Sequence, residues 1–353
     1  MKQNTQNNHI LRIASFLAMT LCTLVSCEKE IEFNGEQIDP KLVINSLVEP
    51  EQPVKAYISK SLFFLDNEGT TQAPADLVAT LYVNGNRIGE MIPTIDTISE
   101  GYEYVDIDSV KPVYKTVSVF ANDYRPVEGD VIKITASANG FDDVDGTASP
   151  LPKSISWSLK SYEIIEWENL NNEWYDYDDG DSIVSFSGKL ELTVEITDPN
   201  PGQTDYFRIL LEAGGATDYE EGSSYYVSTS YDDPVFGASV SGNEYIDISD
   251  FQSRPTGVFT DQLFDGRTYQ LKLPVYLYVT IMGNTPAEFF QVPITLEHMG
   301  KEYYNYLFTC EQTSQIMQLF SEPVQTYSNV NNGYGVVASR NIDSLWFALP
   351  LSE

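Results

Sequence analysis

The stretch GKLELTVEITDPNPG, Gly188 to Gly202, alternates apolar and polar residues and then ends in turn-forming residues. Its apolar positions are Leu190, Leu192, Val194 and Ile196. A period of two places these side chains on one face of a strand, and proline and glycine stop the pattern. This stretch therefore predicts a β-strand with one buried face, followed by a turn over Asp198 to Gly202.

Similar short runs, separated by turn residues, occur on both sides of this strand. Asn84-Gly85 lies between two such runs and predicts a tight hairpin, because a type I′ turn requires positive φ. The spacing of the runs predicts an immunoglobulin-like β-sandwich over residues 39–153. The two prolines of ASPLPKS, Ala148 to Ser154, mark its end, and residues 154–353 are expected to form a second β-rich domain.

One segment follows a helical period instead. KEYYNYLFTCEQTSQIMQLF, residues 301–320, contains no proline or glycine and carries apolar residues at helical spacing. Cys310 lies on this apolar stripe, which favours a buried structural thiol over a nucleophile. The expected fold class is therefore all-β with a C-terminal helix, that is, mainly β.

The strongly acidic composition of the chain excludes some classes of partner. The chain has 353 residues and a formal net charge of −32, from 20 Lys and Arg against 52 Asp and Glu. A field of this sign repels phosphate backbones, so nucleic acid is not an expected partner. Cations, neutral ligands and basic protein surfaces remain compatible with it.

The N-terminus has the pattern of a lipoprotein signal peptide over residues 1–26. Lys2 and Arg12 flank a polar region, and the apolar run from Ile13 to Val25 is shorter than the ~20 residues that span a membrane. The sequence LVS before Cys27 resembles the bacterial lipobox, which implies cleavage before Cys27 and its acylation. We therefore expect a lipid anchor at Cys27 and an acidic tether over residues 27–38. The acidic residues after Cys27 resemble the signal that directs lipoproteins to the outer face of the outer membrane.

The sequence contains few signals of catalysis. His298 is the one histidine after the signal peptide, and there is no GxSxG, HExxH, CxxC or phosphate-binding glycine loop. A pair of carboxylates would suffice for a glycoside hydrolase, but the sequence cannot identify the pair among so many acids. No catalytic residue is predicted.

The segment from Tyr162 to Ser182 mixes acids with aromatic residues and has no Lys or Arg. Four acids on a short turn suggest a Ca²⁺ site, the one cofactor considered: Asp176, Asp178, Asp179 and Asp181. Together with the similar stretch from Asp218 to Asp233, it offers aromatic residues for a ligand or partner surface: Trp167, Trp174, Tyr175, Tyr177, Tyr225 and Tyr226. The alternative is a solvated insertion whose aromatic residues cover the edge of a sandwich.

Three C-terminal segments carry a family resemblance: VFTDQLFDGRTYQLKL (258–273), LEHMGKEYYNYLFTCEQ (296–312) and EPVQTYSNVNNGYGVVAS (322–339). Together they resemble the Bacteroidetes outer-membrane lipoprotein family called domain of unknown function 4249. The resemblance implies a surface-exposed lipoprotein, and an accessory role beside a TonB-dependent β-barrel transporter. It implies no catalytic residues.

Three functions are therefore expected, in order. The first is a non-enzymatic binding or accessory lipoprotein on the outer face of the outer membrane, in a TonB-dependent nutrient-uptake system. The second is an adhesin or fimbrial-type structural subunit, and the third is a carboxylate-based glycoside hydrolase.

Overall fold

The computed structural model describes residues 39–62, 72–106, 109–170, 183–211, 224–238, 257–282, 289–313 and 326–350. The signal peptide, Cys27 and the acidic tether fall outside these residues and stay predictions. Within the described part of the chain, no helix is long and apolar enough to cross a membrane.

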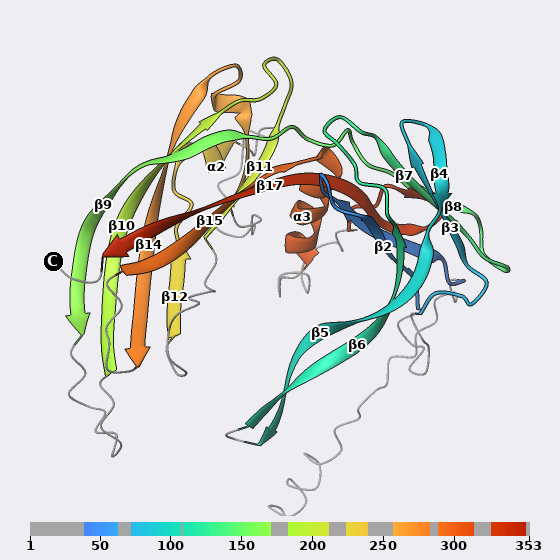
Figure 1. The fold of residues 1–353 in the computed structure, drawn as a ribbon, viewed down its shortest axis with the longest axis horizontal. Coiled ribbons are helices and arrows are strands. Elements are labelled where there is room, and N and C mark those ends of the chain that lie inside the picture. The colour runs from blue at the N-terminus through green and yellow to red at the C-terminus, as the bar shows by residue number, and fades with distance from the viewer. Residues whose placement is uncertain are drawn as a thin grey trace, which may run out of the picture. The chain divides into compact units, whose positions relative to one another are not determined.

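The largest element is an eight-stranded sheet (Figure 1). Its strands, in spatial order, are β13 (Val258–Thr260), β11 (Tyr206–Leu211), β15 (Phe289–Met299), β17 (Tyr334–Pro350), β1 (Leu42–Val48), β2 (Val54–Lys60), β6 (Ser109–Asn122) and β5 (Ile92–Asp106). β1 and β17, from opposite ends of the chain, pair in parallel, whereas the other neighbours pair antiparallel.

The other described strands form two smaller sheets. One consists of β16 (Val330–Asn331), β8 (Val144–Thr147), β7 (Ile132–Ser137), β3 (Val78–Val83) and β4 (Asn86–Glu90). The other consists of β12 (Ser224–Thr229), β14 (Thr268–Met282), β10 (Ile183–Thr197) and β9 (Ser156–Leu170). The described helices are α2 (Pro234–Ala238), the 3₁₀ turn η2 (Asp261–Leu263) and α3 (Lys301–Thr313).

The expected fold class is confirmed: the protein is mainly β with a helix near its C-terminus. The predicted helix is present over residues 301–313, and residues 314–320 lie outside the described part. Cys310 on α3 is half-buried rather than fully buried, and its thiol hydrogen-bonds the hydroxyl of Tyr306.

Local sequence patterns explain individual strands. The alternating residues of β10 are fully buried on one face: Leu190, Leu192, Val194 and Ile196. The predicted hairpin joins β3 to β4, with positive φ at Asn84 (51°) and Gly85 (80°). Gly335, with φ of 105°, is the second residue of β17, and a Cβ atom there would lie 2.2 Å from the carbonyl oxygen of Ile44. The close approach of β17 to β1 therefore requires glycine.

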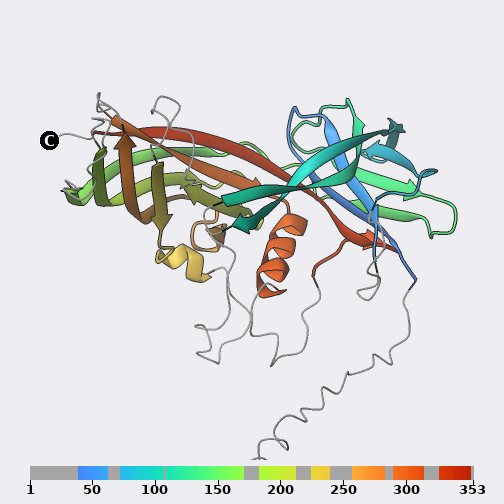
Figure 2. The ribbon, with the colours of Figure 1, turned by 90° about the horizontal axis from the view of Figure 1, so that it is seen from below.

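Two hydrophobic cores lie between the eight-stranded sheet and the smaller sheets. The first core joins β1 and β2 to β3, β7 and β8, and includes Val330 and Val337. The second joins β11, β13, β15 and β17 to β10, β12 and β14. β17, the long red strand in Figure 2, contributes Val337 to the first core and Phe347 to the second, so one strand belongs to both.

The two predicted domains share this sheet. Contacts group Pro40–Glu353 into one compact unit, and the eight-stranded sheet contains strands from both sides of residues 153 and 154. The predicted division into two domains at residues 153 and 154 stays a prediction. The eight-stranded sheet itself contains strands from both predicted domains.

The proline-rich segment at that boundary is held by side chains of β15 and β17. Each of three backbone carbonyls accepts one hydrogen bond: Ser149 from Ser339 Oγ (3.1 Å), Pro152 from Asn341 Nδ2 (3.2 Å) and Lys153 from His298 Nδ1 (2.8 Å). At its start, the Glu302 carboxylate of α3 accepts hydrogen bonds from the N–H and the hydroxyl of Ser149, both at 2.9 Å. The segment is thus fixed to the second half of the sheet.

β17 changes partner at Arg340. Tyr334 to Ser339 pair with β1, and Arg340 to Pro350 pair with β15. The Arg340 guanidinium donates to Glu49, at the end of β1, at 2.7 and 2.8 Å, and to Glu297 of β15 at 2.5 Å. Glu297 is 3% exposed, and the charges of Arg340 and Arg208 compensate its buried carboxylate, with Arg340 bonded to it directly.

We predict that Arg340→Ala destabilises the fold by about 3 kcal/mol, because it removes the cation that hydrogen-bonds the buried Glu297 carboxylate. Urea denaturation of the purified protein measures this change. Arg87→Ala is the control, since the Arg87–Glu90 pair is exposed (side chains 55% and 69%) and is worth less than about 1 kcal/mol. Equal effects of the two substitutions would contradict a structural role for Arg340.

Candidate functional site

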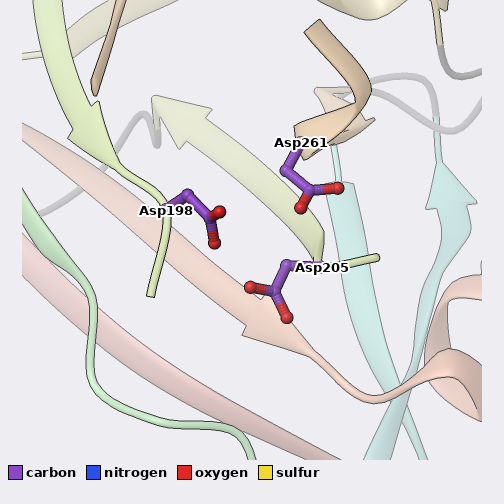
Figure 3. Close-up of side chains that lie close together, drawn as sticks. All are labelled: Asp198, Asp205 and Asp261. Carbon is purple, nitrogen blue, oxygen red and sulfur yellow. The ribbon is translucent and has the colours of Figure 1, made fainter. Parts of the chain in front are cut away.

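Three buried aspartates from separate segments converge beside the eight-stranded sheet (Figure 3). Asp198 follows β10, Asp205 precedes β11, and Asp261 begins η2. One carboxylate oxygen of each residue lies within 4.8 Å of the other two, and the residues are 6%, 6% and 2% exposed. We refer to Asp198, Asp205 and Asp261 as the aspartate triad.

The turn that ends β10 positions Asp198. Its carboxylate accepts hydrogen bonds from the N–H of Asn200, at 2.8 Å, and from the N–H of Gly266. The N–H of Gly202, in the same turn, donates to Asp265 at 2.7 Å. The turn predicted from the sequence is therefore attached to Asp265 and Gly266, directly after η2, and η2 itself begins with Asp261.

His298 holds Asp205. Its Nε2 lies 3.2 Å from Asp205 Oδ1, and its Nδ1 donates to the carbonyl of Lys153. Both ring nitrogens of His298 therefore face oxygen acceptors. Burial alone would raise the pKa of Asp205, but hydrogen bonds from His298 and Asn200 and the charge of His298 lower it below its ordinary value. Asp205 is thus held in a buried contact with His298.

The carboxylate of Asp261 accepts fewer hydrogen bonds than those of Asp198 and Asp205. Among the described residues, no group donates a hydrogen bond to its buried Oδ2. Burial raises the pKa of Asp261 to about 6; a backbone hydrogen bond from Asp205 opposes this rise, and the negative charges of Asp205, Asp198 and Asp265 add to it. Asp261 is therefore ionised at neutral pH, but burial and the neighbouring negative charges destabilise its ionised form.

Two clefts reach the triad from different sides. The larger, of about 520 Å³, is lined by Asp205 and His298 together with the proline-rich segment. The other, of about 450 Å³, is lined by Asp261 and Tyr304. Gln203 and Thr204 line both clefts, so this short connection separates them.

The aromatic residues predicted to form a ligand or partner surface have different environments. Trp167, in β9, is half-buried, and its ring stacks on Phe186 at 5.7 Å against the second core. Tyr226, in β12, is 63% exposed, whereas the side chain of Tyr225 is outside the described residues. The other predicted site residues lie outside the described part of the chain: Trp174, Tyr175, Tyr177, Asp176, Asp178, Asp179 and Asp181.

Tyr226 has two neighbours that we did not predict from the sequence. It pairs with Tyr278 of β14, and Tyr276 lies two residues before Tyr278 on the same face. Tyr276 and Tyr278 are 43% and 41% exposed, while the alternating residues Val275, Leu277 and Val279 are buried. We refer to Tyr226, Tyr276 and Tyr278 as the tyrosine face.

The tyrosine face has charged neighbours. Lys189 of β10 pairs with Tyr276 and places its Nζ 5.5 Å from the ring centroid, a cation–π contact. On the far side of β10, the exposed residues Glu166 and Glu168 of β9 pair with Lys189 and Ser187. The face is therefore aromatic at one edge and acidic at the other.

Sequence reasoning missed both features for different reasons. The alternation in PVYLYV, Pro274 to Val279, contains the signal that Tyr276 and Tyr278 share a face. The aspartate triad has no such signal, because Asp261 is distant in sequence from Asp198 and Asp205, and only the pairing of β11 with β13 brings it close.

We predict that Asp261→Asn is more stable than the wild type at about pH 7.5 in EDTA, and that the difference shrinks as the pH falls to about 4.5. Asp261 has a folded pKa of about 6, above its ordinary 3.8, so the folded state binds more protons in this window. The wild type therefore gains stability on acidification, whereas the amide does not titrate. Urea denaturation at several pH values measures the difference.

The control for this prediction is Asp142→Asn, at an exposed position. Its stability relative to the wild type should not change over this window. A constant difference between Asp261→Asn and the wild type would contradict the ionised, buried state of Asp261.

We predict that Gly188→Ala destabilises the protein by about 1–3 kcal/mol, because a Cβ atom there would lie 2.4 Å from the ring of Trp167. Thermal unfolding measures the loss. Gly89→Ala, at another strand glycine, is the control, since its Cβ would meet only the Asn122 side chain at 3.8 Å. No difference between the two variants would show that Trp167 is free to leave the core for a ligand.

The chain matches a protein family, but no well-characterised relative. No curated protein matches the chain. A solved structure titled "BspA_C_mut" is similar at 8% identity and a TM-score of 0.15, over 75% of this chain and 96% of that chain. The collagen adhesin (CNA) from S. aureus is similar at 9% identity and a TM-score of 0.10, over 89% of this chain and 95% of that chain. At these TM-scores, neither structure defines the fold or the function.

The family model described as "Domain of unknown function (DUF4249)" matches residues 28–345, most of the chain. This protein belongs to the DUF4249 family.

Proposed function

We propose that this protein is a lipid-anchored component of the outer membrane, facing the cell exterior, that binds a ligand or partner for a TonB-dependent uptake system and catalyses no reaction. The lipobox at Cys27 and the acidic residues after it support the location. The structural observation that supports a binding role is the tyrosine face.

The tyrosine face has the physical properties of a binding surface. Its three rings project from neighbouring strands of a sheet whose other face is fully packed, so they are held in place before any partner arrives. Tyrosine offers a large apolar area and a hydroxyl with few rotatable bonds, and it is therefore common among the residues that dominate binding energy.

The negative charge around the tyrosine face favours neutral or basic partners over acidic ones. Glu166 and Glu168 border the tyrosine face, and the whole chain carries a formal charge of −32. A neutral ligand with apolar rings or faces, or a protein surface with basic residues, complements this combination. The rim of an outer-membrane transporter, or the ligand that it imports, is the partner that we propose.

We predict that the full-length lipoprotein co-purifies with a β-barrel transporter from detergent-solubilised outer membrane, and that a Tyr226→Ser, Tyr276→Ser double variant loses this association. Removal of one dominant aromatic residue costs about 2 kcal/mol, or roughly 30-fold in affinity, so two should abolish capture. Quantitative mass spectrometry of the purified fraction measures the ratio of transporter to lipoprotein.

Tyr114→Ser is the matched control, since Tyr114 is also 63% exposed but lies on β6, away from the tyrosine face. It should retain the transporter. Isolation of the wild type as a lone monomer in several mild detergents would contradict the proposal. Polymer ladders on unboiled gels would instead favour the adhesin or fimbrial function.

A further inference from the structure

We propose that the aspartate triad binds a calcium ion. This site differs from the Ca²⁺ loop predicted at Asp176 to Asp181, and it does not depend on the function proposed for the tyrosine face.

The first support is an unsatisfied carboxylate. Asp261 is 2% exposed, and among the described residues its Oδ2 accepts no hydrogen bond. A buried anionic oxygen without a donor is costly, and native structures rarely tolerate one unless an ion or water fills the place. Figure 3 shows its carboxylate grouped with those of Asp198 and Asp205.

The second support is charge. The triad carries three negative charges when ionised, and among the described residues the group in contact with them that can carry a positive charge is the imidazole of His298. At least two negative charges are therefore left in a buried volume, where like charges repel strongly. A divalent cation supplies the missing charge, since buried charges are normally paired or coordinate a metal.

The third support is geometry. Calcium binds oxygen at about 2.3–2.6 Å, so two oxygens on the same ion lie at most about 5 Å apart. One oxygen from each aspartate satisfies this limit, since all three lie within 4.8 Å of one another. The hydrogen bonds that Asp198 and Asp205 accept leave lone pairs on their oxygens, so both can still coordinate an ion.

The ligand chemistry selects a hard cation. All three groups are carboxylates, and both nitrogens of His298 are engaged by Lys153 and Asp205, so the described part of the chain offers zinc no free imidazole or thiol at this site. Calcium tolerates irregular sites with six to eight oxygens, whereas magnesium requires a near-ideal octahedron. The clefts on either side of Gln203 and Thr204 give water access to complete the shell.

Calcium at this place would join three segments that no disulfide can connect. It would link the end of β10, the start of β11 and η2, which lie between the second core and the two clefts. The ion would thus stabilise the half of the fold that carries the tyrosine face, without contact with that face.

The test is calorimetric titration of CaCl₂ into the full-length protein in detergent, after EDTA treatment and dialysis, with thermal unfolding as a second readout. We expect one ion per chain at this site, with a Kd on the order of 10⁻⁴ M, the range of extracellular calcium modules, and an unfolding midpoint that rises with calcium. Asp261→Asn should weaken this binding at least about tenfold and remove the rise.

Two further variants make the result specific. Asp198→Asn removes a second ligand charge and should weaken binding in the same way, so the test does not rest on one substitution. The double variant Asp178→Asn, Asp179→Asn changes only the predicted loop and should leave the triad site intact.

The proposal fails if the wild type binds no calcium at about 5 mM, well above the expected Kd. It also fails if the loop variant abolishes all binding while Asp261→Asn retains it. Magnesium binding as tight as calcium would overturn the assignment to calcium. These outcomes are separate from co-purification with a transporter, so the two proposals can fail independently.

Discussion

The fold depends on one strand that changes partner. β17 pairs in parallel with β1 up to Ser339 and antiparallel with β15 from Arg340 onward, so a single strand carries the hydrogen-bond network from one sandwich to the other. Arg340 lies at the point of change and bonds to the end of β1 through Glu49 and to β15 through Glu297. With Cys310 as the one cysteine among the described residues, this pairing and the two cores hold that part of the chain together.

The same change of partner positions the candidate site. Ser339 and Asn341, on either side of Arg340, hold carbonyls of the proline-rich segment, and His298 of β15 holds a third. The other nitrogen of His298 faces Asp205. A chain of direct contacts therefore runs from the β17 junction, through the proline-rich segment and His298, to the aspartate triad.

The tyrosine face and the aspartate triad differ in burial and polarity: the first exposes aromatic rings, and the second buries carboxylates. The tyrosine face presents three neighbouring aromatic rings to solvent. The triad buries charge, which is unfavourable unless a cation or proton compensates it. Both features lie in the half of the fold built around the second core.

The sequence by itself determined the fold class, the strand from Lys189 to Thr197, the Asn84-Gly85 hairpin and the position of the C-terminal helix. These follow from periodicity and turn chemistry, which act over a few residues. It also indicated Tyr226 as an exposed aromatic residue. Only the tertiary structure decided that β1 lies beside β17, that Trp167 packs into a core, and that Asp261 joins Asp198 and Asp205. The physical reason is that pairing between distant strands, and the burial of charge that results, depend on contacts that no local pattern encodes.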